Sequence, residues 1–359
     1  MRSWIVEPRD PAVFGDGRAV ALSNIIRSHE LPFPPTVAGL ARTRALWGED
    51  GRPRDGRDLA AARAEAKQIA TRGPFLVELD DAGEIAELLV PGPRDAAWTG
   101  PDDRRVRRRL RPQRLPEGAA TDLSGLELVG TDDPIERDKP IPGLRYWRWS
   151  ELARWLARPA DEDVFDAEAM ARLGLDHLER ELRTHVAIDA AKQTASDGML
   201  FSTEGIRFTA PGRRRLGVLF DCARDDLRTG VVTLGGERRL ATLRPARSPW
   251  SGKPPAIEGS LVRLVLLTPG LFTDGFLPRF GAGARVTACI VPRPEVVSGW
   301  DMEHGRPKPG RRVVPAGSVY WVRVEGDATA WLRERWLQSI ADEEQDRRDG
   351  FGIVVGGVA

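Results

Sequence analysis

Cysteine is scarce in this chain of 359 residues, and Cys222 and Cys289 are the only two. Each lies in an apolar run typical of a strand, and two such distant thiols supply too few ligands for a disulfide framework or a zinc site. Histidine is also scarce, and no two histidines have the i,i+4 spacing that places two metal ligands on one helix face. The four are His29, His177, His185 and His304. The sequence therefore predicts reduced, buried thiols, no metal and no other cofactor.

Long hydrophobic runs are absent as well. No apolar stretch approaches the roughly 18–20 residues that span a bilayer, and residues 1–7 reach an acid before a signal-like apolar stretch develops. We therefore expect a cytoplasmic protein with no membrane partner. An excess of one charge is also missing, because 54 basic and 53 acidic residues give a formal net charge of +1. Only local clusters of arginine can therefore indicate a polyanionic partner.

Signatures of catalysis are missing too. The chain has no G-x-S-x-G, no acids spaced for two metals and no Cys–His signature. The tail 350–357 lacks the glycine spacing of a dinucleotide fingerprint, and Gly252-Lys253 lacks the flanking residues of a P-loop. His29, before the first expected helix, could act as a general acid or base, although a lone histidine is more often structural. Apart from this lone histidine, the sequence shows no candidate catalytic signature.

The chain does contain 41% hydrophobic and 30% charged residues, a balance typical of a globular protein of about two domains. In its last third, strands are expected at 261–267, 285–291, 318–324 and 353–355. A helix is expected at 328–340, with Asp327 as its N-cap. With a short element near 276–280, this order is β-α-β-β-α-β, the ferredoxin-like arrangement.

The first part of the chain can be read in the same order, beginning with a strand near Ser3. Helices are expected at 36–47, 58–71, 150–158 and 164–182, and strands at 75–79, 85–90 and 216–220. Residues 91–142 are rich in Pro, Gly and Arg without periodicity, which indicates a long insertion or arm. We therefore predict an α+β protein of two tandem ferredoxin-like (RRM-like) βαββαβ domains. The first covers 1–248 with the insertion at 91–142, and the second covers 249–359 with a glycine-rich tail loop.

Two arginine-rich segments could bind a polyanion. Residues 104–111, with Arg114 beyond, contain six arginines and no acid, and such a run could neutralise phosphates by counterion release. The alternative is an arm that docks on an acidic protein. In the second segment, prolines and a glycine separate the cations, and Trp300 precedes them as a possible stacking partner for a base. The cations are Arg306, Lys308, Arg311 and Arg312. The alternative here is an exposed loop between strands.

Short segments in several parts of the chain resemble one family, the RAMP-superfamily subunit that stands third in the Cmr module. They are residues 4–11 with 14–18, 33–39, 183–189 with 194–195 and 198–201, 234–237, 298–301 with 314–320, and 350–352. The resemblance spans nearly the whole chain. The arginine run at 104–114 is not part of it.

The resemblance implies tandem ferredoxin-like folds in a non-catalytic, RNA-binding scaffold subunit of a type III-B CRISPR effector complex, in antiviral defence. It implies binding of the repeat-derived 5′ tag of the CRISPR RNA, and docking to the large polymerase-like Cmr subunit and to backbone RAMP subunits. Three groups of residues then become candidates for RNA contact. The first group is Arg183, Thr184 and His185 in a protruding hairpin. The second group would bind the phosphates of the tag and consists of Gly299, Trp300, Arg306, Lys308, Arg311 and Arg312. The third group is Gly350, Phe351 and Gly352 in the tail loop.

Two alternatives remain open. Metal-independent CRISPR repeat endoribonucleases of the same superfamily also have two ferredoxin-like domains and a glycine-rich tail, and His29 lies near the position of their general acid or base. A scaffold that contacts only proteins is the other alternative, against which the basic clusters argue.

Overall fold

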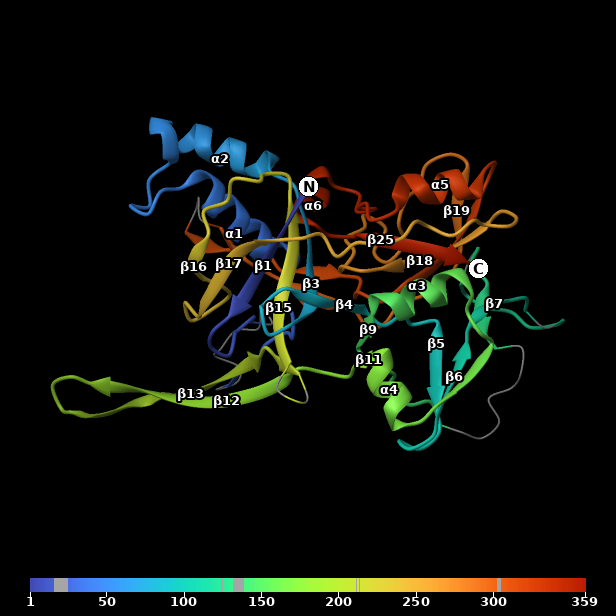
Figure 1. Cartoon of the computed structure of the whole chain (residues 1–359), viewed down its shortest axis with the longest axis horizontal. Coiled ribbons are helices and arrows are strands. Elements are labelled where there is room, and N and C mark those ends of the chain that lie inside the picture. Colours follow the sequence, from blue (N-terminus) through green and yellow to red (C-terminus); the bar gives the residue numbers. More distant parts are fainter. Residues whose placement is uncertain are drawn as a thin grey trace. The chain divides into compact units, whose positions relative to one another are not determined.

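The computed structural model describes residues 1–15, 25–115, 117–123, 125–131, 139–210, 212, 214–301 and 305–359. For residues 197, 198, 300, 301 and 307 it gives the backbone alone. The α+β class is confirmed (Figure 1). No helix in these ranges is long and apolar enough to cross a membrane. The chain forms two compact units, each built from separate segments.

Unit 1 comprises Met1–Ala86, Leu178–Ser248 and Val296–Arg312. Its main sheet is antiparallel, in the order β3-β15-β1-β17-β16. The strands are β1 (Arg2–Pro8), β3 (Thr71–Leu79), β15 (Arg214–Cys222), β16 (Gly230–Thr233) and β17 (Leu240–Ala246), and β14 (Thr209–Ala210) pairs with β15. Apolar residues of β1 and β15 make this sheet the core of the unit, since Ile5, Val218 and Phe220 are fully buried.

Helices of unit 1 lie where the sequence predicts them. Helix α1 (Pro34–Leu46) begins with two prolines in its first turn and packs on β3 through its buried face. Helix α2 (Leu59–Gln68) begins at Asp58, whose side chain accepts hydrogen bonds from the backbone N–H groups of Ala60 and Ala61. A 3-10 turn, η2 (Arg54–Gly56), precedes it.

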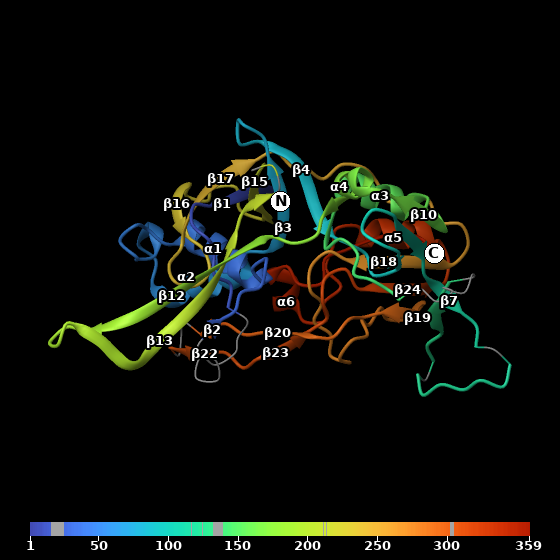
Figure 2. The same ribbon diagram turned by 90° about the horizontal axis from the view of Figure 1, so that it is seen from below.

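The remaining strands of unit 1 form a long hairpin and short strand pairs. The hairpin consists of β12 (Glu179–Asp189) and β13 (Thr194–Arg207), and β2 (Ile25–Ile26) runs parallel to β13. In both Figure 1 and Figure 2 the hairpin extends well beyond the sheet of its unit. Two short pairs are β20 (Glu295–Val297) with β23 (Arg311–Val313), and β21 (Trp300–Asp301) with β22 (Arg306–Pro307).

Unit 2 comprises Glu87–His177, Pro249–Glu295 and Val313–Ala359. Its largest sheet is antiparallel, in the order β19-β24-β18-β25. The strands are β18 (Leu261–Leu266), β19 (Ala284–Ile290), β24 (Val319–Val324) and β25 (Val354–Val358). Helix α5 (Ala328–Arg335) follows β24, and Asp327 caps it by accepting from the backbone N–H of Ala330 at 2.9 Å, as the sequence predicts.

The first segment of unit 2 contains two sets of paired strands and two helices. The strands pair in the orders β11-β9-β4 and β10-β6-β5, of which the second is a sheet of its own. Their strands are β4 (Ile85–Pro91), β5 (Ala96–Thr99), β6 (Arg105–Arg109), β9 (Tyr146–Arg148), β10 (Glu162–Phe165) and β11 (Gly174–Leu175), and the helices are α3 (Trp149–Ala157) and α4 (Ala167–Leu173). A further pair is β7 (Arg111–Gln113) with β8 (Leu128–Gly130).

The structure corrects several local predictions. Residues 91–142 are not a structureless arm, because they contain β5–β8, and Trp98 in this segment is 3% exposed. The helix expected at 164–182 is wrong, since only α4 is helical and Gly174 follows it. A Cβ atom at Gly174 would lie 1.9 Å from the carbonyl oxygen of Tyr146, so the chain turns into β11 at this close contact.

The C-terminal end of the helix expected at 328–340 and the tail also differ from expectation. Helix α5 ends at Arg335 rather than near residue 340, because the backbone N–H groups of Leu337 and Ile340 donate to Val354 and Gly352 instead of continuing the helix. A second helix, α6 (Glu344–Asp349), precedes the tail. In the tail, β25 agrees with the strand expected at 353–355 but continues to residue 358 and pairs with β18, so the glycine-rich loop is shorter than expected.

Candidate nucleic-acid interface

The hairpin β12–β13 presents two chemically different faces. Residues of β12 alternate between exposed and half-buried positions, as expected for a strand that projects from its sheet. One face carries apolar side chains, and Leu182, Val186 and Leu200 are 60%, 45% and 57% exposed. The other face carries Arg183 and His185, which lie opposite Thr203 and Phe201 in the cross-strand register.

Polar contacts hold the cationic face in place. The Nε of Arg183 donates to Glu181, and Arg207 pairs with the same carboxylate. The hydrogen bond from Arg183 keeps the pKa of Glu181 below its usual range. Thr184 points to the other face, where its hydroxyl lies 3.1 Å from that of Ser202.

An aromatic pair lies beside Arg183. The ring of His185 stacks on Phe201 with centroids 5.2 Å apart and planes at 20°, and its Nε2 lies 2.9 Å from the hydroxyl of Thr203. A guanidinium next to stacked rings is an arrangement that can bind a phosphate and an unstacked base together.

The second basic cluster lies on β22 and β23, which we call the basic strands (residues 306–312). All four of its cations are exposed. Of the side chains that the structure describes, none pairs with Arg306, Lys308 or Arg312. The segment is anchored through its backbone, since the N–H of Lys308 donates to the exposed Gly299 at 2.8 Å and Ser298 donates to the carbonyl of Lys308 at 3.0 Å. The side chain of Trp300 and all of His304 lie outside the described residues.

The arginine run at 104–111 has a different environment. Strand β6 pairs with β10, which places three consecutive acids, Asp161, Glu162 and Asp163, opposite the run. The ion pairs are Arg105–Asp102, Arg107–Asp163, Arg108–Glu162 and Arg111–Asp161. The acids that neutralise the run were visible in the sequence, but only the strand pairing reveals that they face it. Four of the six arginines therefore have an acidic partner within the chain, which leaves less positive charge for phosphates than the sequence suggests.

The tail residues Gly350, Phe351 and Gly352 are all buried. Gly350 follows α6 in the left-handed conformation with φ of 98°, which favours glycine. Backbone N–H groups of this segment are already used, because Phe351 donates to Asp346 at 3.0 Å and Gly352 donates to Pro269 at 2.7 Å. Contact of the tail with RNA stays a prediction that these hydrogen bonds do not support.

His29 is half-buried, and its ring meets Phe33 edge to face at 4.6 Å. Its backbone N–H donates to Phe14 at 2.9 Å, which is a structural contact. Within the described ranges, no group of three or more His, Cys, Asp and Glu side chains could hold a metal ion.

Comparisons with known proteins give a family and distant structural matches. The family model of the CRISPR-associated protein Cas_Cmr3 matches residues 4–359. No curated protein matches the chain. One similar structure is a chain of the type III-B Cmr-beta complex bound to cognate target RNA and AMPPnP, at 15% identity and a TM-score of 0.49, covering 89% of this chain and 86% of that one. Another is a chain of the Csm3–Csm4 subcomplex of the type III-A CRISPR-Cas interference complex, at 12% identity and a TM-score of 0.36, covering 91% and 94%.

Proposed function

Because the chain belongs to the CRISPR-associated Cas_Cmr3 family, we propose that it is a non-catalytic, RNA-binding scaffold subunit of a type III-B effector complex. In this role it binds the repeat-derived 5′ tag of the CRISPR RNA. It docks on the large polymerase-like subunit and on backbone RAMP subunits.

The observation that carries RNA binding is the contrast between the two arginine-rich segments. In the run at 104–111, Arg107, Arg108 and Arg111 pair with facing acids. Three cations of the basic strands have no such partner among the described side chains and are exposed. When an exposed, unpaired cation binds a phosphate, it releases a counterion from the RNA. A paired cation must first break its ion pair.

The hairpin supplies the second part of the proposed interface. We assign Arg183 to a phosphate of the tag, for which it must give up its ion pair with Glu181, and the His185–Phe201 pair to a base beside it. Thr184 lies on the opposite face. Gly299 and Trp300 join the basic strands in this assignment. The tandem ferredoxin-like architecture is also part of the proposal, and the sheet order β19-β24-β18-β25 supports it for the second domain.

Salt dependence of RNA binding tests the basic strands. We expect R306A/K308A/R312A in the full chain to weaken binding of a single-stranded tag RNA. The negative slope of log K against log salt concentration should become less steep by about 2. A matched control, K67A/K253A/R333A, removes the same charge from exposed positions where no described side chain pairs with the cation and should leave the slope unchanged. Equal slopes for the two variants would remove the basic strands from the interface.

Cleavage assays separate the enzymatic alternative. A non-catalytic subunit should leave repeat RNA intact without metal, and H29A should make no difference. Cleavage that disappears in H29A would instead establish an endoribonuclease.

A further inference from the structure

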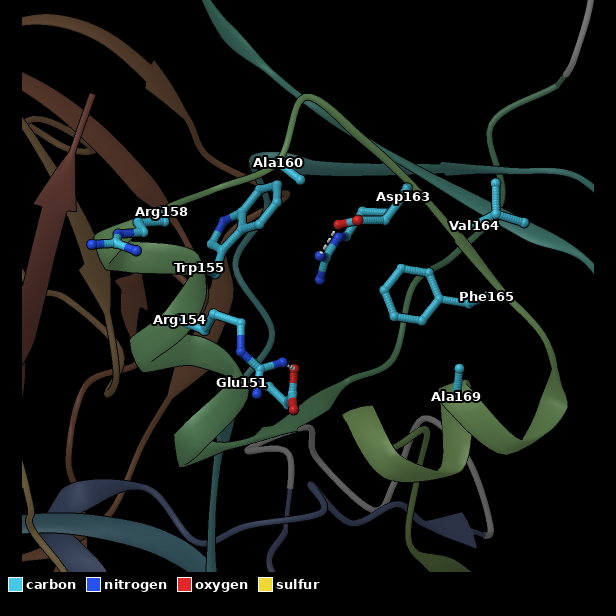
Figure 3. Close-up of a pocket in the computed structure, with 10 residues that line it drawn as sticks. Glu151, Arg154, Trp155, Arg158, Ala160, Asp163, Val164, Phe165 and Ala169 are labelled. Carbon is cyan, nitrogen blue, oxygen red and sulfur yellow. Dashed lines mark hydrogen bonds and ion pairs between the residues drawn. The ribbon is translucent and has the colours of Figure 1, made fainter.

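Unit 2 contains a cavity of about 300 Å³ between α3 and β10 (Figure 3). Its polar lining consists of three arginines and two acids, namely Arg107, Arg154, Arg158, Glu151 and Asp163. Trp155 and Phe165 provide aromatic walls, and Figure 3 shows both rings beside the opening between the charged groups. No local feature of the sequence predicts this site, because its residues become neighbours only when β6 pairs with β10.

The charges that line the cavity do not balance. Glu151 accepts from Arg154 at 2.8 Å, and Asp163 accepts from Arg107. Arg158 is exposed, and among the described residues its side chain has no partner. One positive charge is therefore left at the cavity, which matches a ligand with a single negative charge.

Arg107 adds unused hydrogen-bonding capacity. Its side chain is nine-tenths buried, with its guanidinium carbon 4.4 Å from the ring centroid of Trp155 and 4.8 Å from that of Phe165. Burial lowers the pKa of Arg107, and the hydrogen bond to Asp163 opposes that effect. Its buried Nε has no hydrogen-bond partner. An unused donor in a buried position is costly, so an additional acceptor would be favourable there.

The surroundings favour a lone carboxylate over RNA. Asp161 and Glu162, which precede Asp163, pair with Arg111 and Arg108, so beyond Arg158 the described lining offers no unpaired cation for a second phosphate. The volume lies at the lower end of the range for ligand sites, which suits one side chain. Val164 lines the cavity and is 52% exposed, and it offers an apolar contact at the rim.

We propose that this cavity receives an aspartate or glutamate side chain of a protein partner, held by the guanidinium group of Arg154, with the unpaired charge of Arg158 at the rim. Guanidinium groups bind carboxylates through paired, charge-assisted hydrogen bonds. The site belongs to protein docking. It requires no contact of the hairpin or the basic strands with RNA, so the two proposals can fail separately.

A small carboxylate tests the chemistry of the cavity in the full chain. Ligand-observed NMR should show saturable binding of 3-phenylpropionate and none of the neutral 3-phenylpropanamide. The variants R154Q and R158Q should each weaken binding about ten-fold, whereas R172Q, an exposed arginine on α4 outside the cavity, should bind as the unaltered chain does. Equal binding of the amide, or tighter binding of adenosine monophosphate than of the carboxylate, would overturn the proposal.

Crosslinking in the assembled effector complex tests the occupant. A photoreactive p-benzoylphenylalanine in place of Val164 should crosslink to a protein subunit at a segment that contains Asp or Glu. A crosslink to RNA, or no crosslink to any protein, would overturn protein docking here. The variant R306A/K308A/R312A should leave this crosslink unchanged even where it abolishes tag binding.

Discussion

At the scale of single residues, a buried ion pair is the most consequential feature of unit 2. Asp95 and Arg263 have fully buried side chains, and the guanidinium donates to the carboxylate at 2.5 Å. Arg263 also donates to the carbonyl of Trp155 at 2.6 Å, and the indole of Trp155 donates to Asp95 at 3.1 Å. This network joins β18 to the segment before β5 and to α3. A buried charge that loses its partner is strongly destabilising, so these residues fix which segments pack together.

We expect D95N to lower the free energy of unfolding by about 3–5 kcal/mol, because it leaves the Arg263 charge buried and unpaired. Urea denaturation of the full chain measures the change. The control is D161N, which breaks the exposed ion pair with Arg111 and should cost less than about 1 kcal/mol. Similar losses in the two variants would mean that the buried pair contributes no more than a surface one.

At the scale of elements, the glycines of β25 allow this strand to lie close to two helices. A Cβ atom at Gly357 would lie 2.1 Å from the carbonyl oxygen of Leu156 in α3, and one at Gly356 would lie 2.6 Å from the side chain of Leu332 in α5. The absence of side chains thus lets two helices pack directly on the strand. These glycines serve close packing.

The substitution G357A should therefore destabilise the protein by about 1–3 kcal/mol through overpacking against α3. The exposed Gly39 of α1 is the matched control, because a Cβ atom there would contact nothing within 4 Å. G39A should stabilise the protein by about 0.5–1 kcal/mol through helix propensity. Thermal unfolding of both variants checks the opposite signs, and a neutral G357A would contradict the packing argument.

Elements with local signals were predictable from the sequence. Helices α1 and α2 carry their proline and aspartate start signals, and Asp327 marks the beginning of α5. Predictions failed where the structure depends on a distant partner. Nothing local shows that residues 105–109 pair with 162–165.

The candidate interface was likewise predictable where its signals are local and not where it depends on a distant strand. The hairpin that begins near Arg183 and the exposure of Arg306, Lys308 and Arg312 agree with the sequence-based expectation. The stacking of His185 on Phe201 was not predictable, because it requires the cross-strand register, which a local irregularity shifts between Val186 and Ile188. A single residue of slip would move every side chain of a strand to its other face.

At the scale of the whole molecule, each compact unit combines segments that lie far apart in the sequence. Unit 2 combines residues 87–177 with most of the chain beyond residue 248, and unit 1 includes residues 296–312. The expected boundary between 248 and 249 assigned residues 87–177 to the first domain. Whether 249–359 is a folding domain of its own stays a prediction, and the contacts within unit 2 supply a sharp test of it.

A fragment of residues 249–359 contains all four strands of the sheet β19-β24-β18-β25 but lacks the segment that covers it. Arg263 would lose both Asp95 and the Trp155 carbonyl, and β25 would lose its contact with α3. We therefore expect the fragment to show neither dispersed amide resonances nor cooperative unfolding, whereas addition of residues 87–177 as a second chain should restore both. Cooperative unfolding of the fragment alone would establish a second domain that begins near residue 249. Failure in both experiments would instead mean that unit 2 requires the rest of the chain to fold.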